Sequence, residues 1–483
     1  MLSYVKKHPL ICFLSIHFLV WTLLPLLRHS LPMDSIEAVV WGQYCDLGTN
    51  KHPPLSGFLA YWFYALGGGR HIMIYALSQV CVLLGFVYIY KLACNFLSKE
   101  KAAFAVMLLE GVIYYGFSAP EYNVNVVSLA LWPMTVYYFY KALQGGKNID
   151  WIFTGLFAGL NLLNKYVSGV LLLAMLVYMI VDKSARRKFL TFGPYLTATV
   201  AIAVVAPHIY WLWRHDFFVI SYFLGRGESG GFASFPLLKH IVYPLKFLAA
   251  QMVFGLGALL IYFIATRKAE KEAVAVSADD KLFLQILGLA PLLIMLAVSM
   301  LGGIKFKSMW GFPLWYMGGI MLFAFFPRYI TENVKRRLFV GVYIIMLLMA
   351  TVLACVYTFN KSDKLHLNAP EYALTIENLW LRNADGKPFK YVAGDVWWTD
   401  NVALYAPSAP KPVIWGDIAK NPWFDEADFN ASGALVLATG KEEYNGLKKV
   451  LDNLSEPQII EVDCKNPVGK IKRKTIYYGF YNL

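Results

Sequence analysis

Long apolar segments, separated by short basic or glycine-containing loops, dominate the chain up to about residue 359. A helix of roughly 17–25 apolar residues is long enough to cross a bilayer. The pattern predicts about eleven such spans, near residues 9–28, 72–96, 102–118, 123–143, 150–164, 166–182, 191–213, 244–266, 282–301, 310–327 and 338–358. The apolar stretch 57–69 is shorter, which predicts an interfacial or re-entrant segment.

The pattern changes after residue 359, where short apolar runs alternate with Gly, Pro, Asn and Asp. Runs at 433–439 and 471–480 predict strands, and 442–454 predicts a helix. We therefore expect a polytopic α-helical membrane domain over 1–359, with an amphipathic first outer loop at 29–69. A small soluble α/β domain is expected over 360–483.

Composition supports a membrane protein, since 58% of the residues are hydrophobic and only 16% are charged, against about 25% charged in soluble domains. The net charge of +13 does not indicate nucleic-acid binding, because the Lys and Arg residues lie mainly in short loops between apolar runs. Their distribution predicts a cytoplasmic N-terminus and a C-terminal domain on the outer side of the membrane. Cys45 and Cys464 fall on the same predicted side, and whether they form a disulfide is left open.

Two carboxylates in the first outer loop are candidates for acid–base chemistry. Asp34 and Glu37 are spaced i, i+3, so they share a face of a helix, and Tyr44 extends the same amphipathic segment. A carboxylate at the membrane surface suits a general base that deprotonates an acceptor hydroxyl. The alternative is structural, with Asp34 capping the helix and Glu37 solvated.

Basic residues on the predicted outer side form a second group of candidates. Fixed cations stabilise the charge that develops on a phosphate leaving group, and the alternative is that they only reach toward lipid headgroups. These residues are Lys51, His52, Lys165, Arg214, Arg226, Lys305 and Lys307.

Motifs that the sequence lacks restrict the classes of reaction to be considered. The sequence has no HExxH or CxxC pattern, so no metal or cofactor is indicated, although a divalent metal is left open. It has no P-loop and no GxGxxG in a strand–helix context, which argues against a nucleotide-sugar donor. Glu110 lies inside the third predicted span and is expected to face the interior and form a hydrogen bond there, not to act in catalysis.

Several motifs, in a consistent order along the chain, resemble the C-type membrane glycosyltransferases. They are closest to bacterial members related to protein O-mannosyltransferases and to the lipid A aminoarabinose transferase. The motifs are Lys51-His52-Pro53-Pro54-Leu55, Tyr122-Asn123-Val124 through Leu131-Trp132-Pro133, GLNLLNKY at 159–166, Pro207-His208 through Trp211, KFKSMW at 305–310, and the stretch 391–423.

The resemblance implies a glycosyltransferase that takes a sugar from a polyprenyl (undecaprenyl) phosphate donor. The acceptor would be lipid A, lipopolysaccharide or another envelope glycolipid. Asp34 occupies the place of the family's acidic residue near sugar and acceptor. The sequence departs from the family where His52, not Lys, immediately precedes Pro53, which leaves the phosphate contact divided between Lys51 and His52.

Further contacts to the substrate are expected from the same motifs, at Tyr44, Glu121, Tyr122, Asn123 and His208. A transporter or flippase of lipid-linked glycans, a protein O-glycosyltransferase and a structural scaffold remain alternatives.

Overall fold

The computed structural model describes residues 8–44, 46–145, 147–217, 219–220, 236–273, 276–417, 421 and 424–483. The chain forms two compact units. The first unit comprises residues 1–23, 51–55 and 75–351, and the second comprises 24–50, 56–74 and 352–483. The second unit thus joins parts of the first predicted outer loop to the C-terminal residues. The boundary that we expect between a membrane domain ending at residue 359 and a soluble domain beginning at residue 360 stays a prediction.

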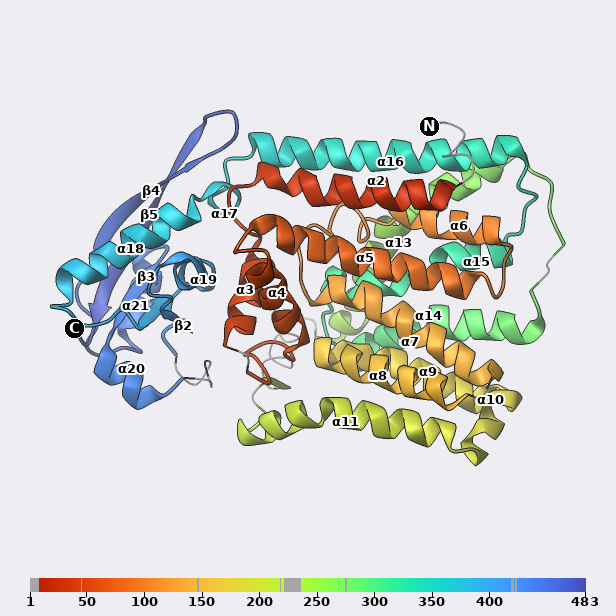
Figure 1. Ribbon diagram of the computed structural model, residues 1–483, viewed down its shortest axis with the longest axis horizontal. Coiled ribbons are helices and arrows are strands. Elements are labelled where there is room, and N and C mark those ends of the chain that lie inside the picture. The colour runs from red at the N-terminus through yellow and green to blue at the C-terminus, as the bar shows by residue number, and fades with distance from the viewer. Residues whose placement is uncertain are drawn as a thin grey trace. The chain divides into compact units, whose positions relative to one another are not determined.

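The first unit is a bundle of helices, and Figure 1 shows several of them lying side by side. Its helices are α2 (Pro9–Leu23), most of α5 (His71–Ala93), α6 (Lys99–Met107), α7 (Val124–Gly145), α8 (Asn148–Asn164), α9 (Gly169–Val181), α10 (Lys183–Arg187), α11 (Gly193–Arg214), α13 (Lys239–Thr266), α14 (Ala278–Gly302), α15 (Gly318–Phe325) and most of α16 (Glu332–Phe359).

Six helices of the described residues are long and apolar enough to cross a membrane, or seven if the bent pair over 166–190 is counted as one span. They are Pro9–Leu27, His71–Ala93, Gly193–Arg214, Lys239–Thr266, Ala278–Gly302 and Glu332–Phe359. Each overlaps a predicted span. The chain is therefore a multi-pass membrane protein, but the predicted count of about eleven spans is not confirmed.

Two predicted spans are interrupted. The segment predicted at 102–118 is α6 followed by a 3-10 turn, Leu108–Gly111. A Cβ atom at Gly111 would lie 2.4 Å from the backbone N of Ala258, so the backbones of this turn and α13 approach closely. The segment predicted at 310–327 is a 3-10 helix, Ser308–Trp315, and then the short α15.

Helix α8 packs against both α11 and α7 in the first unit, and the two contacts differ in chemistry. On its α11 side, a Cβ atom at Gly155 would lie 2.4 Å from the carbonyl O of Thr197, so the absence of a side chain permits close packing. On its α7 side the contacts are polar. The Asn161 amide donates to Thr135 Oγ1 at 2.8 Å, and the Asn164 amide donates to Ser128 Oγ at 3.0 Å. Such bonds satisfy the N–H donors of amide side chains that are buried in the bundle.

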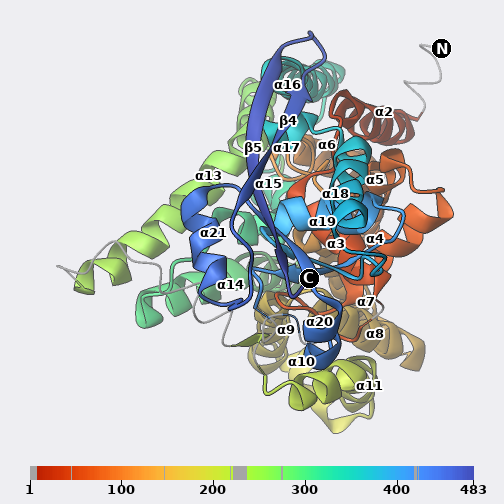
Figure 2. The ribbon, with the colours of Figure 1, turned by 90° about the vertical axis from the view of Figure 1, so that its left-hand side faces the viewer.

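The second unit contains a five-stranded sheet of order β2-β1-β3-β5-β4. Figure 2 shows its long strands β4 and β5 side by side. Its strands are β1 (Tyr391–Gly394), β2 (Lys411–Ile414), β3 (Ala434–Ala438), β4 (Gln458–Lys465) and β5 (Ile471–Tyr481). Strand β1 is parallel to β2 and β3, whereas β5 is antiparallel to β3 and β4. The predicted strands at 433–439 and 471–480 are therefore confirmed as β3 and β5.

Helices of this unit include α3 (Met33–Gln43), α4 (Leu55–Leu66), α17 (Asp363–His366), α18 (Ala369–Asn383), α19 (Val396–Tyr405), α20 (Glu426–Ser432) and α21 (Lys441–Lys448). Helix α21 is shorter than the helix predicted at 442–454, since residues after Lys449 form turns. The core beneath the sheet is apolar and includes Val413, Val436 and Phe429. The predicted small α/β domain is thus present, and α3 from the first predicted outer loop packs against its helix α19.

Candidate functional site

The two candidate carboxylates lie on α3 in the second unit. The helix begins after Pro32, with no side-chain cap, so Asp34 lies in the first turn and is not the N-cap residue. A carboxylate in that position is favoured by the helix dipole. Glu37, one turn later, is only 3% exposed. The alternative in which Asp34 caps the helix and Glu37 is solvated is therefore wrong on both points.

Tyr44 follows the same helix and is held among buried groups of the second unit. Its ring makes an edge contact with Phe424 at a centroid distance of 5.8 Å. Burial raises the pKa of the Tyr44 hydroxyl, and the charge of Asp400 raises it further. Asp400 lies on α19 and is 1% exposed. The region beside Tyr44 therefore combines an aromatic face with a buried acidic group.

Lys165 is the most deeply buried candidate cation in the first unit, at 6% exposed. It follows the end of α8 with an extended backbone. Its Nζ donates to Asn125 Oδ1 at 2.5 Å and lies 5.2 Å from the ring centroid of Trp310. Because burial of an isolated ammonium is costly, these two neighbours stabilise the charge within the bundle. The motifs that contain Lys165 and Trp310 are thereby brought together.

Asn125 is itself positioned by the start of α7. The side-chain carbonyl of Asn123 accepts from the backbone N–H of Asn125 at 2.9 Å, which satisfies one of the unpaired donors of the first turn. The next residues toward the N-terminus are Tyr122, which is fully buried, and Glu121, which is half-buried. Asn123 thus has a local structural role in addition to the substrate contact that is proposed for it.

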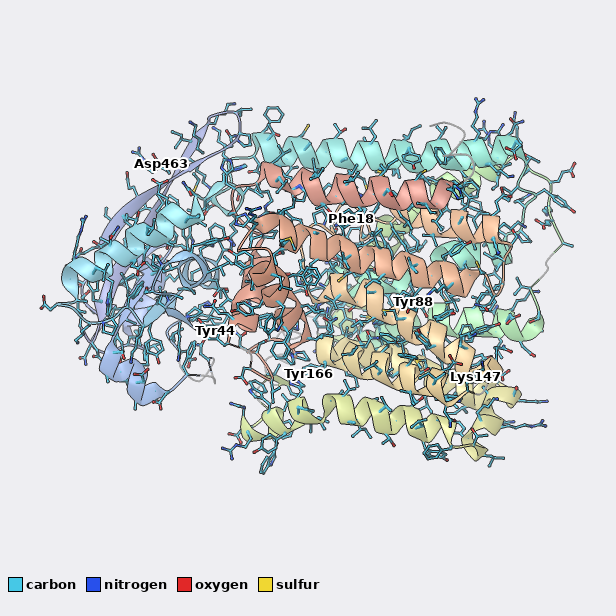
Figure 3. The ribbon with its side chains drawn as sticks, in the orientation of Figure 1. Phe18, Tyr44, Tyr88, Lys147, Tyr166 and Asp463 are labelled. Carbon is cyan, nitrogen blue, oxygen red and sulfur yellow. The ribbon has the colours of Figure 1, made fainter. Side chains whose placement is uncertain are left out.

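His208 on α11 belongs to a row of rings in the first unit. Its Nε2 lies 2.7 Å from the hydroxyl of Tyr166, which is labelled in Figure 3. The rings of His208 and Trp211 are stacked at a centroid distance of 5.9 Å, and Trp211 and His215 lie 4.3 Å apart. His208 is 1% exposed. The sequence motif from Pro207 to Trp211 therefore contacts the Lys-Tyr motif at 165–166.

The other predicted cations are less enclosed. Lys51 and His52 are half-buried, whereas Arg214, Lys305 and Lys307 are exposed. Exposure agrees equally well with phosphate binding and with contact to headgroups, so both alternatives stay open for these residues. Arg226 and Cys45 lie outside the described residues, and the pairing of Cys45 with Cys464 is not tested. Among the residues that are described, no group of three His, Cys, Asp or Glu could hold a metal ion.

Glu110 lies in the interior of the first unit, which confirms the position expected from the sequence. One carboxylate oxygen lies 2.6 Å from Nδ1 of His17, and the other accepts from Nε1 of Trp21 at 3.0 Å. Glu110 and His17 are both fully buried. The sequence did not reveal the two partners, which lie about ninety residues earlier on α2. A histidine in the middle of the first apolar run was the one available signal.

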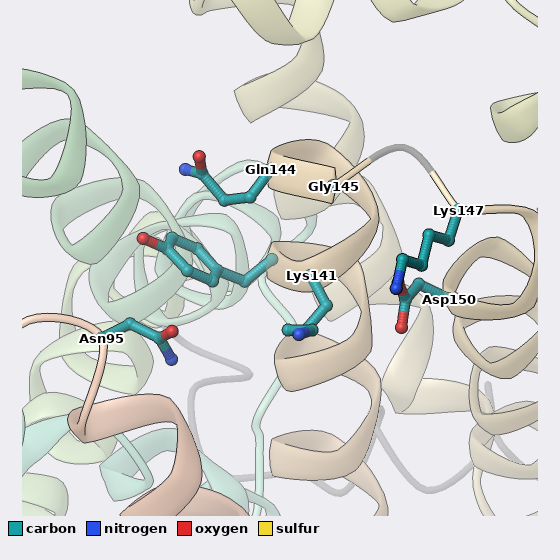
Figure 4. Close-up of a pocket in the computed structure, with 7 residues that line it drawn as sticks. Asn95, Lys141, Gln144, Gly145, Lys147 and Asp150 are labelled. Carbon is teal, nitrogen blue, oxygen red and sulfur yellow. The ribbon is translucent and has the colours of Figure 1, made fainter.

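A polar cavity of about 330 Å³ lies elsewhere in the first unit, around the end of α7 and the start of α8 (Figure 4). The cavity is lined by Asn95, Tyr140, Lys141, Gln144, Gly145, Lys147 and Asp150. None of these is a predicted site residue. Figure 4 shows the side chains of Lys147 and Asp150 pointing toward each other. The cavity is therefore distinct from the candidate site residues described above.

Comparison with known proteins gives a consistent result. Residues 51–211 match the model of the dolichyl-phosphate-mannose-protein mannosyltransferase family. The lipopolysaccharide core galacturonosyltransferase RgtB of Rhizobium johnstonii is 24% identical over 79% of this chain and 78% of that protein. RgtA of the same organism is 24% identical over 38% of each chain.

Solved structures with the same fold include ArnT from Cupriavidus metallidurans. The crystal structure bound to undecaprenyl phosphate has a TM-score of 0.64 and 13% identity, over 97% of both chains. The apo structure has a TM-score of 0.64 and 12% identity, over 98% of both chains. These similarities confirm the resemblance that the sequence motifs indicated.

Proposed function

We propose that the protein is a membrane glycosyltransferase of the C type, which moves a sugar from a polyprenyl phosphate to an envelope glycolipid. Its similarity to a mannosyltransferase family, to a lipopolysaccharide core galacturonosyltransferase and to the fold of ArnT supports this proposal. The acceptor is the lipopolysaccharide core or lipid A, and the sugar is a hexuronic acid. The observation that carries this proposal is the similarity to a lipopolysaccharide core galacturonosyltransferase along most of both chains. The binding of undecaprenyl phosphate by ArnT, which shares this fold, supports the class of donor.

The proposed reaction is a displacement at the anomeric carbon of the donor. An acceptor oxygen forms the new glycosidic bond while the bond from the sugar to the phosphate oxygen breaks. Polyprenyl phosphate leaves with the electron pair, so its negative charge grows in the transition state. A fixed cation that contacts those oxygens stabilises the transition state more than the bound donor.

Lys165 is the cation that we assign first to this role. Its ammonium group is enclosed, and its hydrogen bond to Asn125 fixes its direction. An ammonium that is already desolvated and oriented interacts with phosphate more strongly than one in water. Lys51, His52, Arg214, Lys305 and Lys307 are proposed to hold the lipid phosphate from the more exposed positions.

Asp34 is proposed as the group that acts on the acceptor. If the acceptor is a hydroxyl, its proton passes to the Asp34 carboxylate as the new bond forms. If the acceptor is already a phosphate anion, no base is needed, and Asp34 then stabilises positive charge on the sugar. Glu37 is proposed to support the same chemistry from its buried position on α3.

Substrate contacts are proposed at Tyr44, Glu121, Tyr122, Asn123 and His208. Tyr44 offers a half-buried aromatic ring, and the hydrogen bond between His208 and Tyr166 offers polar groups beside stacked rings. Such surfaces suit sugars, which present apolar ring faces and polar edges. The expected location is a bacterial inner membrane, with the C-terminal residues on the periplasmic side.

A protein acceptor is a second candidate, favoured by the match of residues 51–211 to a protein mannosyltransferase family. Mass spectrometry of envelope glycolipids distinguishes the two. Cells that lack the protein should lose one sugar from lipid A or the core oligosaccharide, and the wild-type chain should restore it. An unchanged glycolipid profile together with a lost protein glycan would replace the proposed acceptor with a protein.

Two variants complete this experiment. Asp34→Asn should fail to restore the sugar, because the amide neither accepts a proton nor carries charge. Asp452→Asn, an exposed position beyond α21, serves as the matched control and should restore it fully. Equal restoration by both variants would remove Asp34 from the mechanism without affecting the assignment of the acceptor.

A further inference from the structure

The hairpin formed by β4 and β5 in the second unit ends in a well-defined turn. Asn466 accepts from the backbone N–H of Gly469 at 2.9 Å, and its own N–H donates to the carbonyl of Lys470 at 3.0 Å. The side chain of Asn466 also accepts from the N–H of Lys470 at 2.8 Å. Gly469 has a φ of +79°, which a glycine adopts without strain. The turn therefore presents its neighbouring side chains in a fixed arrangement.

The side chains around this turn combine positive charge with exposed apolar surface. Val468 and Ile471 are 47% and 55% exposed, and neither belongs to a core. Lys465, Lys470 and Lys472 surround them and are exposed as well. We call these five residues the basic tip. Exposed apolar side chains between lysines are typical of segments that lie in a membrane interface.

The acidic residues of the hairpin do not neutralise the basic tip. Asp463 and Glu461 both pair with Arg473, at 2.9 and 3.3 Å. Arg473 also lowers the pKa of Asp463. Within the described residues, no carboxylate lies within 4.0 Å of the Nζ of Lys465 or Lys470. The tip therefore keeps a positive charge that is available to an external anion.

The position of the tip within its own unit links it to the membrane surface. Lys472 Nζ lies 3.5 Å from a carboxylate oxygen of Asp363, the first residue of α17. Asp363 follows closely after Phe359, where the apolar helix α16 ends. Figures 1 and 2 both show the end of the hairpin beside α17 and this end of α16. A span that ends there places the basic tip at headgroup level.

The same region carries further cations. Lys361 and Lys364 are exposed between α16 and the start of α18. The Arg28 guanidinium lies 5.5 Å from the ring centroid of Tyr357, in the last turns of α16. Aromatic and basic residues at the end of a span mark the membrane–water boundary. The hairpin thus adds its charges to a surface that already attracts anions.

We propose that the basic tip docks on the anionic phospholipid headgroups of the leaflet at which α16 ends. Lys465 and Lys470 contact the phosphates, and Val468 and Ile471 enter the interface. This contact anchors the sheet of the second unit to the bilayer surface. It goes beyond the proposed transfer reaction, because the partner is the bulk lipid and neither the donor nor the acceptor.

The test uses the full chain in lipid nanodiscs, with a fluorescent amino acid at Val468 and headgroup-labelled quencher lipids. A reference sample carries the same fluorophore at Gly446, an exposed position on α21. Nanodiscs of phosphatidylcholine are compared with nanodiscs that also contain phosphatidylglycerol. We expect stronger quenching at Val468 when the anionic lipid is present, and no such change at Gly446.

Charge variants make the test specific. Each lysine near an anionic surface increases the binding constant about fivefold. The variant K465Q/K470Q should therefore lower the affinity of the tip for the anionic lipid roughly 25-fold and remove the quenching that phosphatidylglycerol adds. K441Q/K449Q removes two exposed lysines of the α21 region as the matched control and should leave it unchanged. Equal quenching at Val468 and Gly446, or no effect of K465Q/K470Q, would overturn the proposal. Quenching that requires lipid A and does not respond to phosphatidylglycerol would also overturn it, since the tip would then bind the acceptor.

Discussion

Replacement of Lys165 by Met separates the proposed catalytic role of this cation from a structural one. Met fills a similar volume but cannot carry charge or donate a hydrogen bond. In the wild-type protein, the Lys165 ammonium lies 2.5 Å from Asn125 Oδ1 and 5.2 Å from the centroid of Trp310. The substitution therefore removes one hydrogen bond, one cation–π contact and one positive charge from a nearly closed environment.

The expected loss of activity follows from the interaction that disappears. A hydrogen bond to a charged group contributes about 1.5–3 kcal/mol, which corresponds to a loss of roughly 10- to 150-fold in kcat/KM. The charge on the leaving phosphate grows during the reaction, so the loss should fall mainly on kcat and less on KM. We expect this result from a steady-state assay of sugar transfer with the reconstituted Lys165→Met protein.

The structural alternative predicts a different outcome. Without Lys165, the carbonyl oxygen of Asn125 loses a donor, and an unsatisfied buried acceptor costs about 1–3 kcal/mol of stability. The double variant K165M/N125L removes both partners and should recover stability but not activity. An unchanged kcat at normal stability would refute the phosphate role. Activity that returns together with stability in the double variant would assign Lys165 a structural role only.

Three further predictions test other parts of the protein. Glu110→Leu should lower the midpoint of thermal unfolding in detergent, because His17 and Trp21 each lose a buried partner at about 1–3 kcal/mol per group; an unchanged midpoint would contradict this. Burial and two nearby basic groups lower the pKa of His366, so folding keeps it neutral, and stability should fall as the pH drops below the unfolded value of about 6.5. The variant His366→Gln should show a shallower decline between pH 7.5 and pH 5.5, and an identical slope would show that His366 is not the cause. Asp34→Asn should reduce transfer to a hydroxyl acceptor by about 100- to 10,000-fold, the range of general base catalysis, but should affect a phosphate acceptor less; equal losses with both acceptors would exclude a role as base.

The sequence predicted those features that depend on local pattern. Long apolar runs located the six membrane-length helices, and alternation with turn residues located β3 and β5. The interior position of Glu110 followed from the cost of an ionisable group in a span. Its partners could not be predicted, because His17 reaches it through tertiary packing of α2.

Features that depend on close packing were also hidden from the sequence. Hydropathy gives no sign that a short 3-10 turn follows α6, or that Gly111 in this turn lies close to the backbone of α13. The burial of Glu37 could not be predicted either, because periodicity on α3 does not reveal which neighbours cover it. Likewise, the grouping of α3 with α19 depends on contacts between residues that are several hundred positions apart.

Transfer from a defined donor with purified, reconstituted protein tests the proposed function most directly. The donor is a synthetic polyprenyl phosphate that carries a hexuronic acid, and the acceptor is a lipopolysaccharide that lacks that sugar. We predict that one molecule of polyprenyl phosphate is released for each sugar that appears on the acceptor, and that a nucleotide-activated hexuronic acid does not replace the donor. Transfer directly from the nucleotide sugar, or movement of the lipid-linked sugar across the membrane without transfer, would contradict the account.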